Sequence, residues 1–374
     1  MPLPVSPPAM PKAPRVLSLD LMRGLIMILL AAESCLLYES LDELSWPGIP
    51  GLLVKQFFHH PWHGLHAWDL VQPAFMTMAG AALYISYHYK RQRGIGHGQQ
   101  WKHILLRCCK LFICGTGLHC IYAGHLVWEL WNVLTQLAFT TIIAYWIIDR
   151  SNTFQLTVAV LLLLLTEVLY RTVLVPGFDQ PFTEYKNFGA WVDTLVMGKI
   201  NQGGWVFINI IPTAAHTIWG VLAGRLLIQE VPPAGKIRKL LVAGLIGLAI
   251  GYGLDLAGIT PIIKRIATSS FVFASGGWVM LILAFLYWLA DVKKMNRYAW
   301  IFTVVGMNSI FIYLFFETVG HQWLNGAVGT FVKGGTGLVG VSLSGQALLT
   351  ALATLFVEWA LCYWLYKRKI FFKL

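Results

Sequence analysis

With 374 residues, of which 57 % are hydrophobic and only 12 % charged, the chain has a mean hydropathy of +0.64. This composition excludes a sizeable soluble domain and is typical of membrane proteins with many spans in the lipid bilayer. The net charge of +11 comes from basic residues in short clusters between apolar runs, a pattern that indicates a cytosolic membrane face and argues against nucleic-acid binding.

The chain opens with residues 1–14, which contain six prolines and are predicted to be disordered. The apolar run after Arg15 imitates a cleavable signal peptide, but Asp20 and Arg23 interrupt the apolar region that such a signal needs. We therefore expect a retained first span and a single transmembrane domain over residues 15–374.

Windows of about 20 apolar residues predict an all-α polytopic membrane protein with about ten transmembrane helices. The candidate spans are 16–38, 67–89, 104–124, 131–149, 154–174, 204–228, 239–258, 271–291, 300–320 and 346–366.

The basic residues predict the orientation of these spans. With the N-terminus in the cytosol, 20 of the 28 Lys and Arg residues fall on the cytosolic side and seven on the opposite face, while Arg23 lies within a span. This asymmetry predicts that both termini are cytosolic. The loop between the first two spans and the long connections 175–203 and 321–345 should then face outward.

Six cysteines lie mostly within apolar runs and lack the Cys-x-x-Cys spacing of metal sites, so they are expected to be buried free thiols. A disulfide between Cys35 and Cys120, both near one membrane face, is the less favoured alternative.

Charged residues inside predicted spans are candidate functional positions because the bilayer disfavours them. Asp20 and Arg23 share one helical face, where they either form a structural ion pair or leave Arg23 to bind a phosphate or an amide. Glu33 is either a solvated rim residue or part of an outer site. Glu167 and Arg171, four residues apart, are expected to pair at a helix end.

Polar groups near the later spans also allow two interpretations. Gln136, Asn308 and Ser309 suit hydrogen bonds between helices. Glu317 and His321 are four residues apart and form either a helix-end salt bridge or a carboxylate that orients an imidazole.

The densest cluster of proton-transfer groups lies in segment 59–80, which reads HHPWHGLHAWDLVQPAFMTMAG. Four histidines fall within eight residues, and Asp69 follows at the predicted membrane boundary. Any account of function therefore has to explain this segment.

Three functions fit the histidine cluster. Metal binding would use His59 with His63, or His63 with His66, but Pro61 interrupts the helix that this spacing needs, so no metal is expected. Proton-coupled sugar transport without acetyl transfer is the alternative, although the titratable groups crowd one face instead of crossing the bilayer. Acid–base or nucleophilic catalysis needs one histidine oriented by a carboxylate such as Asp69.

Several short motifs, in order along the chain, resemble the heparan-alpha-glucosaminide N-acetyltransferase family and its bacterial members. The matching positions are RVLSLD at 15–20 followed by Arg23 and Gly24, then His59, Trp62, GL at 64–65, DL at 69–70, Pro73, Gly80, VLTQ at 133–136, Gly224, TPIIK at 260–264 and GMNSI at 306–310. The resemblance extends from Arg15 to Glu317.

This resemblance implies a transmembrane acetyltransferase that uses cytosolic acetyl-CoA to acetylate the amine of an amino sugar or glycan end outside. It places the catalytic histidine at His59, whereas an alignment shifted by one position would place it at His60. Whether the histidine carries the acetyl group or only removes a proton stays open. The remaining candidates are Asp69 for orienting the imidazole, Arg23, Gln136, Asn308 and Ser309 for the acetyl-CoA side, and Trp62, His63 and Glu317 for the acceptor.

Two departures from the family pattern point to a different acceptor pocket. The family's Phe-Pro-Trp-Phe is here QPAF at 72–75, and its His-Glu pair is here Phe316-Glu317. The expected location is a bacterial inner membrane, with the active histidine on the periplasmic side. The resemblance is compatible with a homodimer, although no sequence feature specifies an interface.

Overall fold

The protein is described by a computed structural model covering residues 15–295 and 297–372. The predicted disorder of residues 1–14 lies outside the described residues. Within these ranges the fold is all-helical and contains only two isolated β-bridges, His63 with Ile263 and Val175 with Phe178. The predicted fold class is therefore confirmed.

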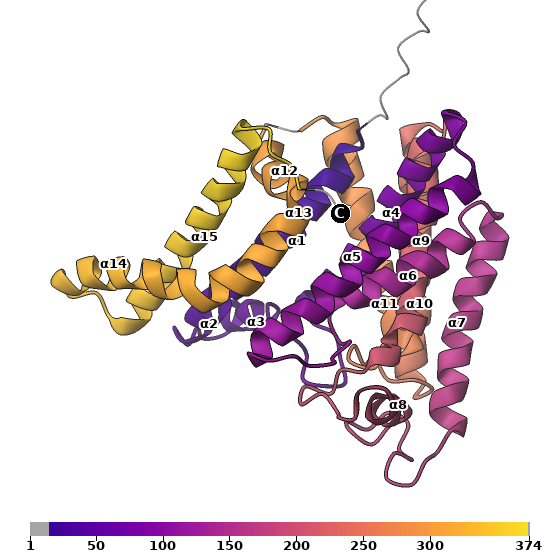
Figure 1. Cartoon of the computed structure of the whole chain (residues 1–374), viewed down its shortest axis with the longest axis horizontal. Coiled ribbons are helices and arrows are strands. Elements are labelled where there is room, and N and C mark those ends of the chain that lie inside the picture. The colour runs from indigo at the N-terminus through magenta and orange to yellow at the C-terminus, as the bar shows by residue number, and fades with distance from the viewer. Residues whose placement is uncertain (1–14, 296, 373–374) are drawn as a thin grey trace, which may run out of the picture.

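Most of the α-helices pack together as a bundle, and the others lie in its connections or beside it (Figure 1). The bundle helices are α1 (Leu17–Ser34), α4 (Val71–Gln92), α5 (His97–Ala123), α6 (Val133–Trp146), α7 (Asn152–Thr172), α9 (Ile210–Ile228), α10 (Pro233–Leu256), α11 (Ser269–Tyr287), α12 (Ala299–Met307), α13 (Ser309–Phe315) and α15 (Leu343–Lys367). The remaining α-helices are α2 (Leu37–Asp42), α3 (Ile49–Lys55), α8 (Phe188–Met197) and α14 (Asn325–Leu338). Two 3₁₀-helices, η1 (Ala67–Leu70) and η2 (Phe207–Asn209), and two π-helices, η3 (Trp288–Val292) and η4 (Phe316–Leu324), complete the described structure.

Six described helices are long and apolar enough to cross a membrane: His97–Ala123, Asn152–Thr172, Phe207–Ile228, Pro233–Leu256, Ser269–Val292 and Leu343–Lys367. A seventh candidate joins Ala299–Met307 to Ser309–Leu338 through a 76° bend. The predicted count of about ten spans is not confirmed, although a helix lies in each predicted range. Helices α1, α4 and α6 are not among these candidate spans. Three charged residues interrupt α1, α4 ends in a polar segment, and α6 has only 14 residues.

Glycines bring α4 and α9 into backbone contact at the centre of the bundle. A Cβ atom added to Gly80 would lie 2.0 Å from the carbonyl oxygen of Thr217, and one added to Gly220 would lie 2.0 Å from that of Thr77. No side chain fits at such a separation, because packed interiors leave no spare volume. The two helices therefore act as a rigid support for the segment that precedes α4.

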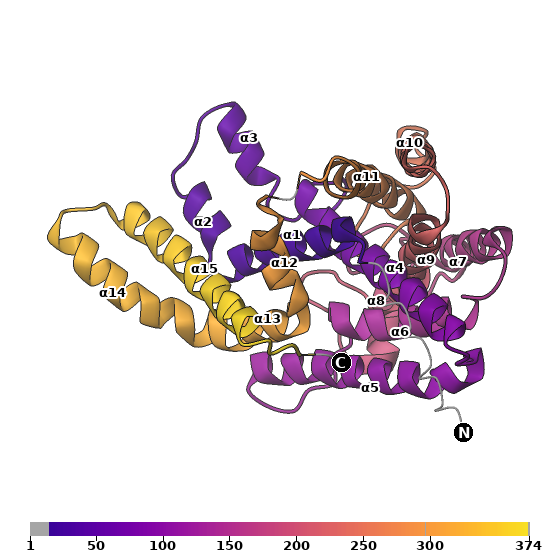
Figure 2. The same cartoon turned by 90° about the horizontal axis from the view of Figure 1, so that it is seen from above.

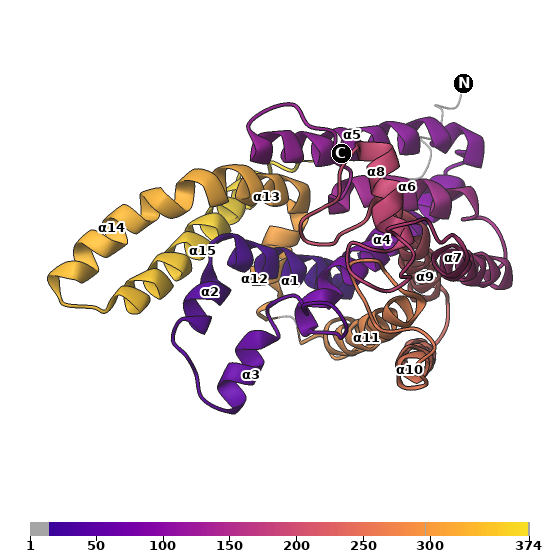
Figure 3. The same ribbon diagram turned by 90° about the horizontal axis from the view of Figure 1, so that it is seen from below.

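The helices α2, α3 and α8 lie at one end of the bundle, together with the connections that carry the histidine cluster (Figures 1 and 3). The pair α14–α15 extends sideways from the other helices (Figure 2). The six cysteines are free thiols, so the alternative disulfide between Cys35 and Cys120 is not formed.

Candidate active site

His59 and Asp69 form a hydrogen-bonded pair just before α4. The Nδ1 atom of His59 lies 2.9 Å from Oδ1 of Asp69, whose side chain is 1 % exposed. The other carboxylate oxygen accepts the backbone N–H groups of His60 at 3.2 Å and His66 at 2.9 Å. Asp69 thereby folds the segment around itself and holds the imidazole by one nitrogen, which leaves Nε2 for chemistry.

Lys264 completes the cluster from the connection between α10 and α11. Its side chain is 7 % exposed, and its Nζ atom lies 3.1 Å from Nδ1 of His59 and 3.4 Å from Oδ1 of Asp69. The ammonium group also lies 5.3 Å from the centre of the Trp205 ring, a separation suited to a cation–π contact. A cation, a carboxylate and an imidazole thus share one buried site.

These neighbours set the protonation of the site. Burial, followed by the charge of Lys264, lowers the pKa of His59 to about 4. Burial alone would raise the pKa of Asp69, but the hydrogen bond with His59 and the charge of Lys264 lower it to about 2. Burial lowers the pKa of Lys264 to about 8, against the opposing effect of Asp69. At neutral pH the imidazole is therefore uncharged and able to act as a base or a nucleophile.

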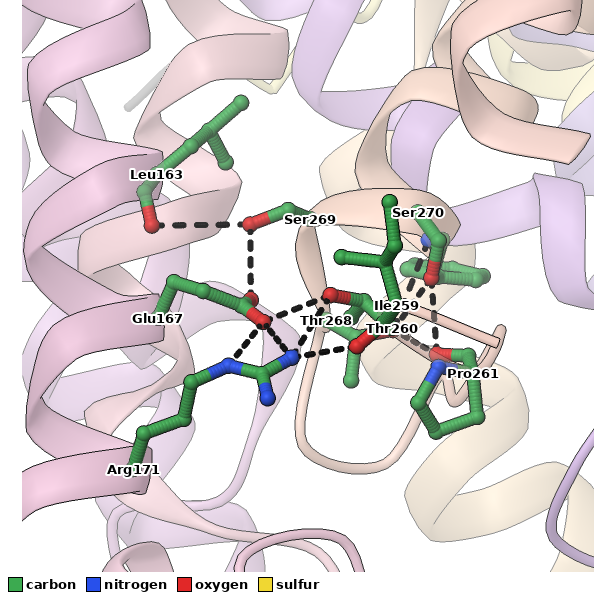
Figure 4. A network of polar contacts seen from close by, with 10 residues as sticks. Leu163, Glu167, Arg171, Ile259, Thr260, Pro261, Thr268, Ser269 and Ser270 are labelled. Atoms are coloured by element: carbon green, nitrogen blue, oxygen red, sulfur yellow. Dashed lines mark hydrogen bonds and ion pairs between the residues drawn. The ribbon is translucent and has the colours of Figure 1, made fainter. Parts of the chain in front are cut away.

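The connection 257–268, which carries Lys264, is fixed to α7 by a polar network (Figure 4). Glu167 pairs with Arg171 at 2.6 Å, as expected from their spacing, and also accepts hydrogen bonds from Thr260 at 2.5 Å and Ser269 at 3.2 Å. The carboxylate therefore ties the start of this connection and the start of α11 to one helix.

The same connection is also tied to the histidine segment and to α9. The N–H of Gly64 donates to the carbonyl of Ile262 at 2.9 Å, and the side-chain amide of Asn209 donates to the carbonyl of Arg265 at 2.6 Å. Lys264 lies between these two anchors, so its position beside His59 follows from backbone contacts on both sides.

His59 lines a partly open cavity of about 330 Å³, here called the histidine cavity. Residues from seven separate parts of the chain line it, namely Leu30, Glu33, His59, Trp68, Val71, Gln72, Phe75, His119, Tyr122, Trp131, Asn132, Val133, Gln136, Asn201, Trp205, Lys264, Tyr313 and Glu317. Its wall is apolar with a few convergent polar groups, the usual pattern of a small-molecule site.

A second cavity of about 370 Å³, the middle cavity, adjoins the histidine cavity. Phe75 and Tyr313 line both. The middle cavity is mostly apolar, but Arg23 and Arg107 are also among the residues that line it.

Two further cavities, here called the basic-end cavities, adjoin the middle cavity. One of about 390 Å³ shares Arg23 with it and also contains Arg15, Lys90 and Arg93. The other, of about 710 Å³, shares Arg107 and is lined by further basic side chains, namely Lys90, His103 and Lys110. Neighbouring cavities therefore extend from a cluster of cations to the imidazole of His59.

Six of the nine residues predicted for the site lie along this series of cavities. His59, Gln136 and Glu317 line the histidine cavity, Arg23 and Ser309 line the middle cavity, and Asp69 lies behind His59. Gln136 also accepts a hydrogen bond from Gln72.

The other three predicted residues do not line these two cavities. Trp62 donates to the carbonyl of Phe182 at 2.8 Å, and His63 contacts Asp255 at 2.6 Å. Asn308 binds the C-terminal segment through the carbonyl of Ile370 at 3.0 Å.

The structure also bears on the choice among the histidines. His60 is absent from the described lining of the histidine cavity, and its ring packs against that of His66 with centroids 4.8 Å apart. The histidines considered as metal ligands bind different carboxylates, since His59 contacts Asp69 and His63 contacts Asp255. Over residues 15–295 and 297–372, no group of three or more His, Cys, Asp or Glu side chains is placed to hold a metal ion.

Sequence reasoning gave no role to Lys264 or His119. Lys264 lies 205 positions from His59 and was visible only as the last residue of the TPIIK motif. His119 lies near the end of a predicted span, where a single histidine carries no pattern.

These features define a multi-pass, all-helical membrane protein whose internal cavities lead to a carboxylate-oriented histidine. The sequence model for the catalytic region of heparan-alpha-glucosaminide N-acetyltransferase matches residues 15–252, and the chain belongs to this family. It is 24 % identical over 376 aligned positions to the human heparan-alpha-glucosaminide N-acetyltransferase, an alignment that covers 83 % of this chain and 53 % of the human protein. The chain thus spans about half the length of that relative, and the family resemblance seen in the motifs is confirmed.

Proposed function

We propose that this protein transfers the acetyl group of cytosolic acetyl-CoA across the membrane to the amine of an amino sugar of the glucosamine type. His59 is the catalytic histidine, and Asp69 orients it. The protein lies in a bacterial inner membrane with His59 towards the periplasm, and residues 15–374 act as one transmembrane domain. Family membership supports the reaction class, and the positive-inside distribution of Lys and Arg supports the orientation.

The observation that carries this proposal is the series of cavities from the basic end to His59. Acetyl-CoA has a polyanionic nucleotide part and a long, thin, mostly uncharged arm that ends in the thioester. The two basic-end cavities hold cations suited to phosphates, and the middle cavity is lined largely by apolar residues. Such a route lets the nucleotide stay at the cytosolic face while the thioester reaches the imidazole.

Along this route the guanidinium groups of Arg23 and Arg107 lie where a phosphate or the first amide of the arm would pass. Ser309 lines the same cavity, and Gln136 lies further along in the histidine cavity, where its amide can bind the arm. Asn308 supports the route indirectly, because its amide bonds hold the segment that brings Phe372 into the middle cavity.

At the end of the route, the neutral imidazole acts on the acetyl transfer in one of two ways. Nε2 either attacks the thioester carbonyl and carries the acetyl group, or it removes a proton from the amine in a complex of both substrates. Asp69 serves both mechanisms because it fixes the imidazole through Nδ1. Glu317, which lines the histidine cavity, is an acceptor-binding group.

The proposal is tested with purified protein in sealed vesicles, labelled acetyl-CoA on the basic side and glucosamine on the other. Labelled N-acetylglucosamine should form with the native protein and with His63→Ala, whose ring contacts Asp255 outside the histidine cavity. It should be lost in His59→Ala. Entry of unmodified glucosamine without any acetyl transfer would contradict the proposal and favour the transporter.

A further inference from the structure

The histidine cavity contains a second imidazole that is oriented by a carboxylate. His119, near the end of α5, places Nδ1 2.6 Å from Oε2 of Glu129, and Lys199 places its Nζ atom 2.5 Å from Oε1 of the same carboxylate. The group of His119, Glu129 and Lys199 resembles the group of His59, Asp69 and Lys264. In each, an imidazole contacts a carboxylate that also contacts a lysine. Both imidazoles line one cavity.

The two imidazoles have different nearest partners within the one cavity. Lys264 contacts His59, whereas the ionised carboxylate of Glu129 contacts His119, and Glu317 accepts a hydrogen bond from Tyr122 on the helix of His119. A cationic group entering the cavity is repelled by Lys264 and attracted by the carboxylate beside His119. An ammonium ion is therefore expected on the side of His119.

The charged partners of His119 are closer to solvent than those of His59. The side chains of Glu129 and Lys199 are 19 % and 42 % exposed, whereas Asp69 and Lys264 are almost fully buried. Burial would raise the pKa of Glu129, but its contacts with Lys199 and His119 lower it, so the carboxylate stays ionised beside the imidazole. A proton taken up by His119 can therefore leave to water beside these partly exposed partners.

Acetylation of an amine requires the removal of two protons, because the acceptor arrives as an ammonium ion. The first must leave nitrogen before its lone pair can attack the carbonyl carbon. As the C–N bond forms and the C–S bond breaks, the second leaves nitrogen and ends on the departing thiolate. The net products are the amide, the thiol of CoA and one proton released to water.

We propose that His119 is a second catalytic residue, which removes the first proton from the acceptor ammonium while His59 acts at the acetyl group. This inference rests on the proposed acetyl transfer. The N–H bond of the ammonium breaks, and Nε2 of His119 takes the proton with Glu129 bonded to Nδ1. The imidazolium then passes the proton to water, and the neutral amine reacts at the acetyl centre.

The test compares two acceptors that differ in charge: glucosamine, present mainly as an ammonium ion at neutral pH, and hydroxylamine, which is uncharged there. His119→Gln should lower kcat with glucosamine about 100-fold, in line with the loss of one general base. With hydroxylamine its rate should stay within about threefold of the native rate. His59→Ala should abolish transfer to both acceptors.

Two further variants sharpen the result. Glu129→Gln should reduce glucosamine acetylation selectively, like His119→Gln. His125→Gln, in the same connection, should act like the native protein, because that exposed ring contacts only the Ala123 carbonyl among the described residues. Equal losses of His119→Gln with both acceptors, or no loss with either, would overturn the inference. Failure of the native protein to acetylate either acceptor would instead contradict the proposed function.

Discussion

Lys264 places its ammonium nitrogen 3.1 Å from Nδ1 of His59, so a fixed cation borders the imidazole that is proposed to perform the chemistry. The same ammonium lies 3.4 Å from Asp69, which offsets its charge. The cation disfavours protonation of the ring, while the carboxylate holds the ring in place. One carboxylate can therefore orient the histidine without turning it into an imidazolium ion at neutral pH.

Replacing Lys264 by Met should move the acid limb of the pH–rate profile to higher pH. Burial and the charge of Lys264 lower the pKa of His59 to about 4, while Asp69 acts in the opposite direction. Without the lysine, burial remains the main effect that opposes Asp69, so the ring gains its proton at a higher pH. Acetyl transfer measured between pH 4 and 9 should therefore fall far more at pH 5 than at pH 8.

Lys264→Arg, which keeps the positive charge, is the matched control for this prediction. Its acid limb should stay close to that of the native protein even if its maximal rate drops. An unchanged acid limb in Lys264→Met would show that the cation does not control the protonation of His59.

Replacing Asp69 by Asn should lower kcat by about 100-fold or more, because the amide can no longer stabilise the charge that the ring gains during proton transfer. The effect should fall mainly on kcat, since Asp69 lies behind His59 and does not line the described cavity. Steady-state kinetics with varied acetyl-CoA checks this expectation. A change confined to KM would instead place Asp69 in substrate binding.

Replacing Arg107 by Gln should raise KM for acetyl-CoA about tenfold or more, because Arg107 lines both the middle cavity and a basic-end cavity. A charge-assisted contact to phosphate contributes about 1.5–3 kcal/mol. S-acetyl-pantetheine lacks the phosphates, so its KM should be similar in the variant and the native protein. Equal increases for both donors would argue against a phosphate-binding role.

The pairing of His59 with Asp69 could be predicted from the sequence, because the two residues are ten positions apart and both lie near the start of one predicted helix. The positions of Trp62 and His63 could not be predicted in this way. Between His59 and Asp69, the chain forms a β-bridge from His63 to Ile263, and the side chains of Trp62 and His63 contact other loops. Such a contact depends on a segment 200 positions away and leaves no local pattern.

The helices were predictable where an apolar run was long, and less so where function or packing broke it. The predicted range 300–320 is interrupted at Asn308 and ends in the π-helix η4. The range 131–149 shortens to α6, which begins with Asn132 as its cap and ends at Trp146. Lys264 was beyond sequence reasoning because its role depends on how the connection 257–268 is anchored to α7 and α9.

The rigid contact between α4 and α9 gives a prediction about stability. Gly80→Ala should destabilise the protein by about 1–3 kcal/mol, because the new methyl group would overlap the carbonyl of Thr217 and push the two helices apart. Thermal unfolding in detergent should show a clear decrease in Tm. Acetyl transfer should fall as well, since α4 directly follows the turn that holds Asp69.

Gly117→Ala on α5 is the matched control, because no other atom lies within 4 Å of the position of its added Cβ among the described residues. Alanine lowers the conformational entropy of the unfolded chain, so this variant should be neutral or more stable by up to about 1 kcal/mol. Equal Tm values for the two variants would mean that α4 and α9 separate easily. The support of the histidine segment would then have to come from the connection 257–268 alone.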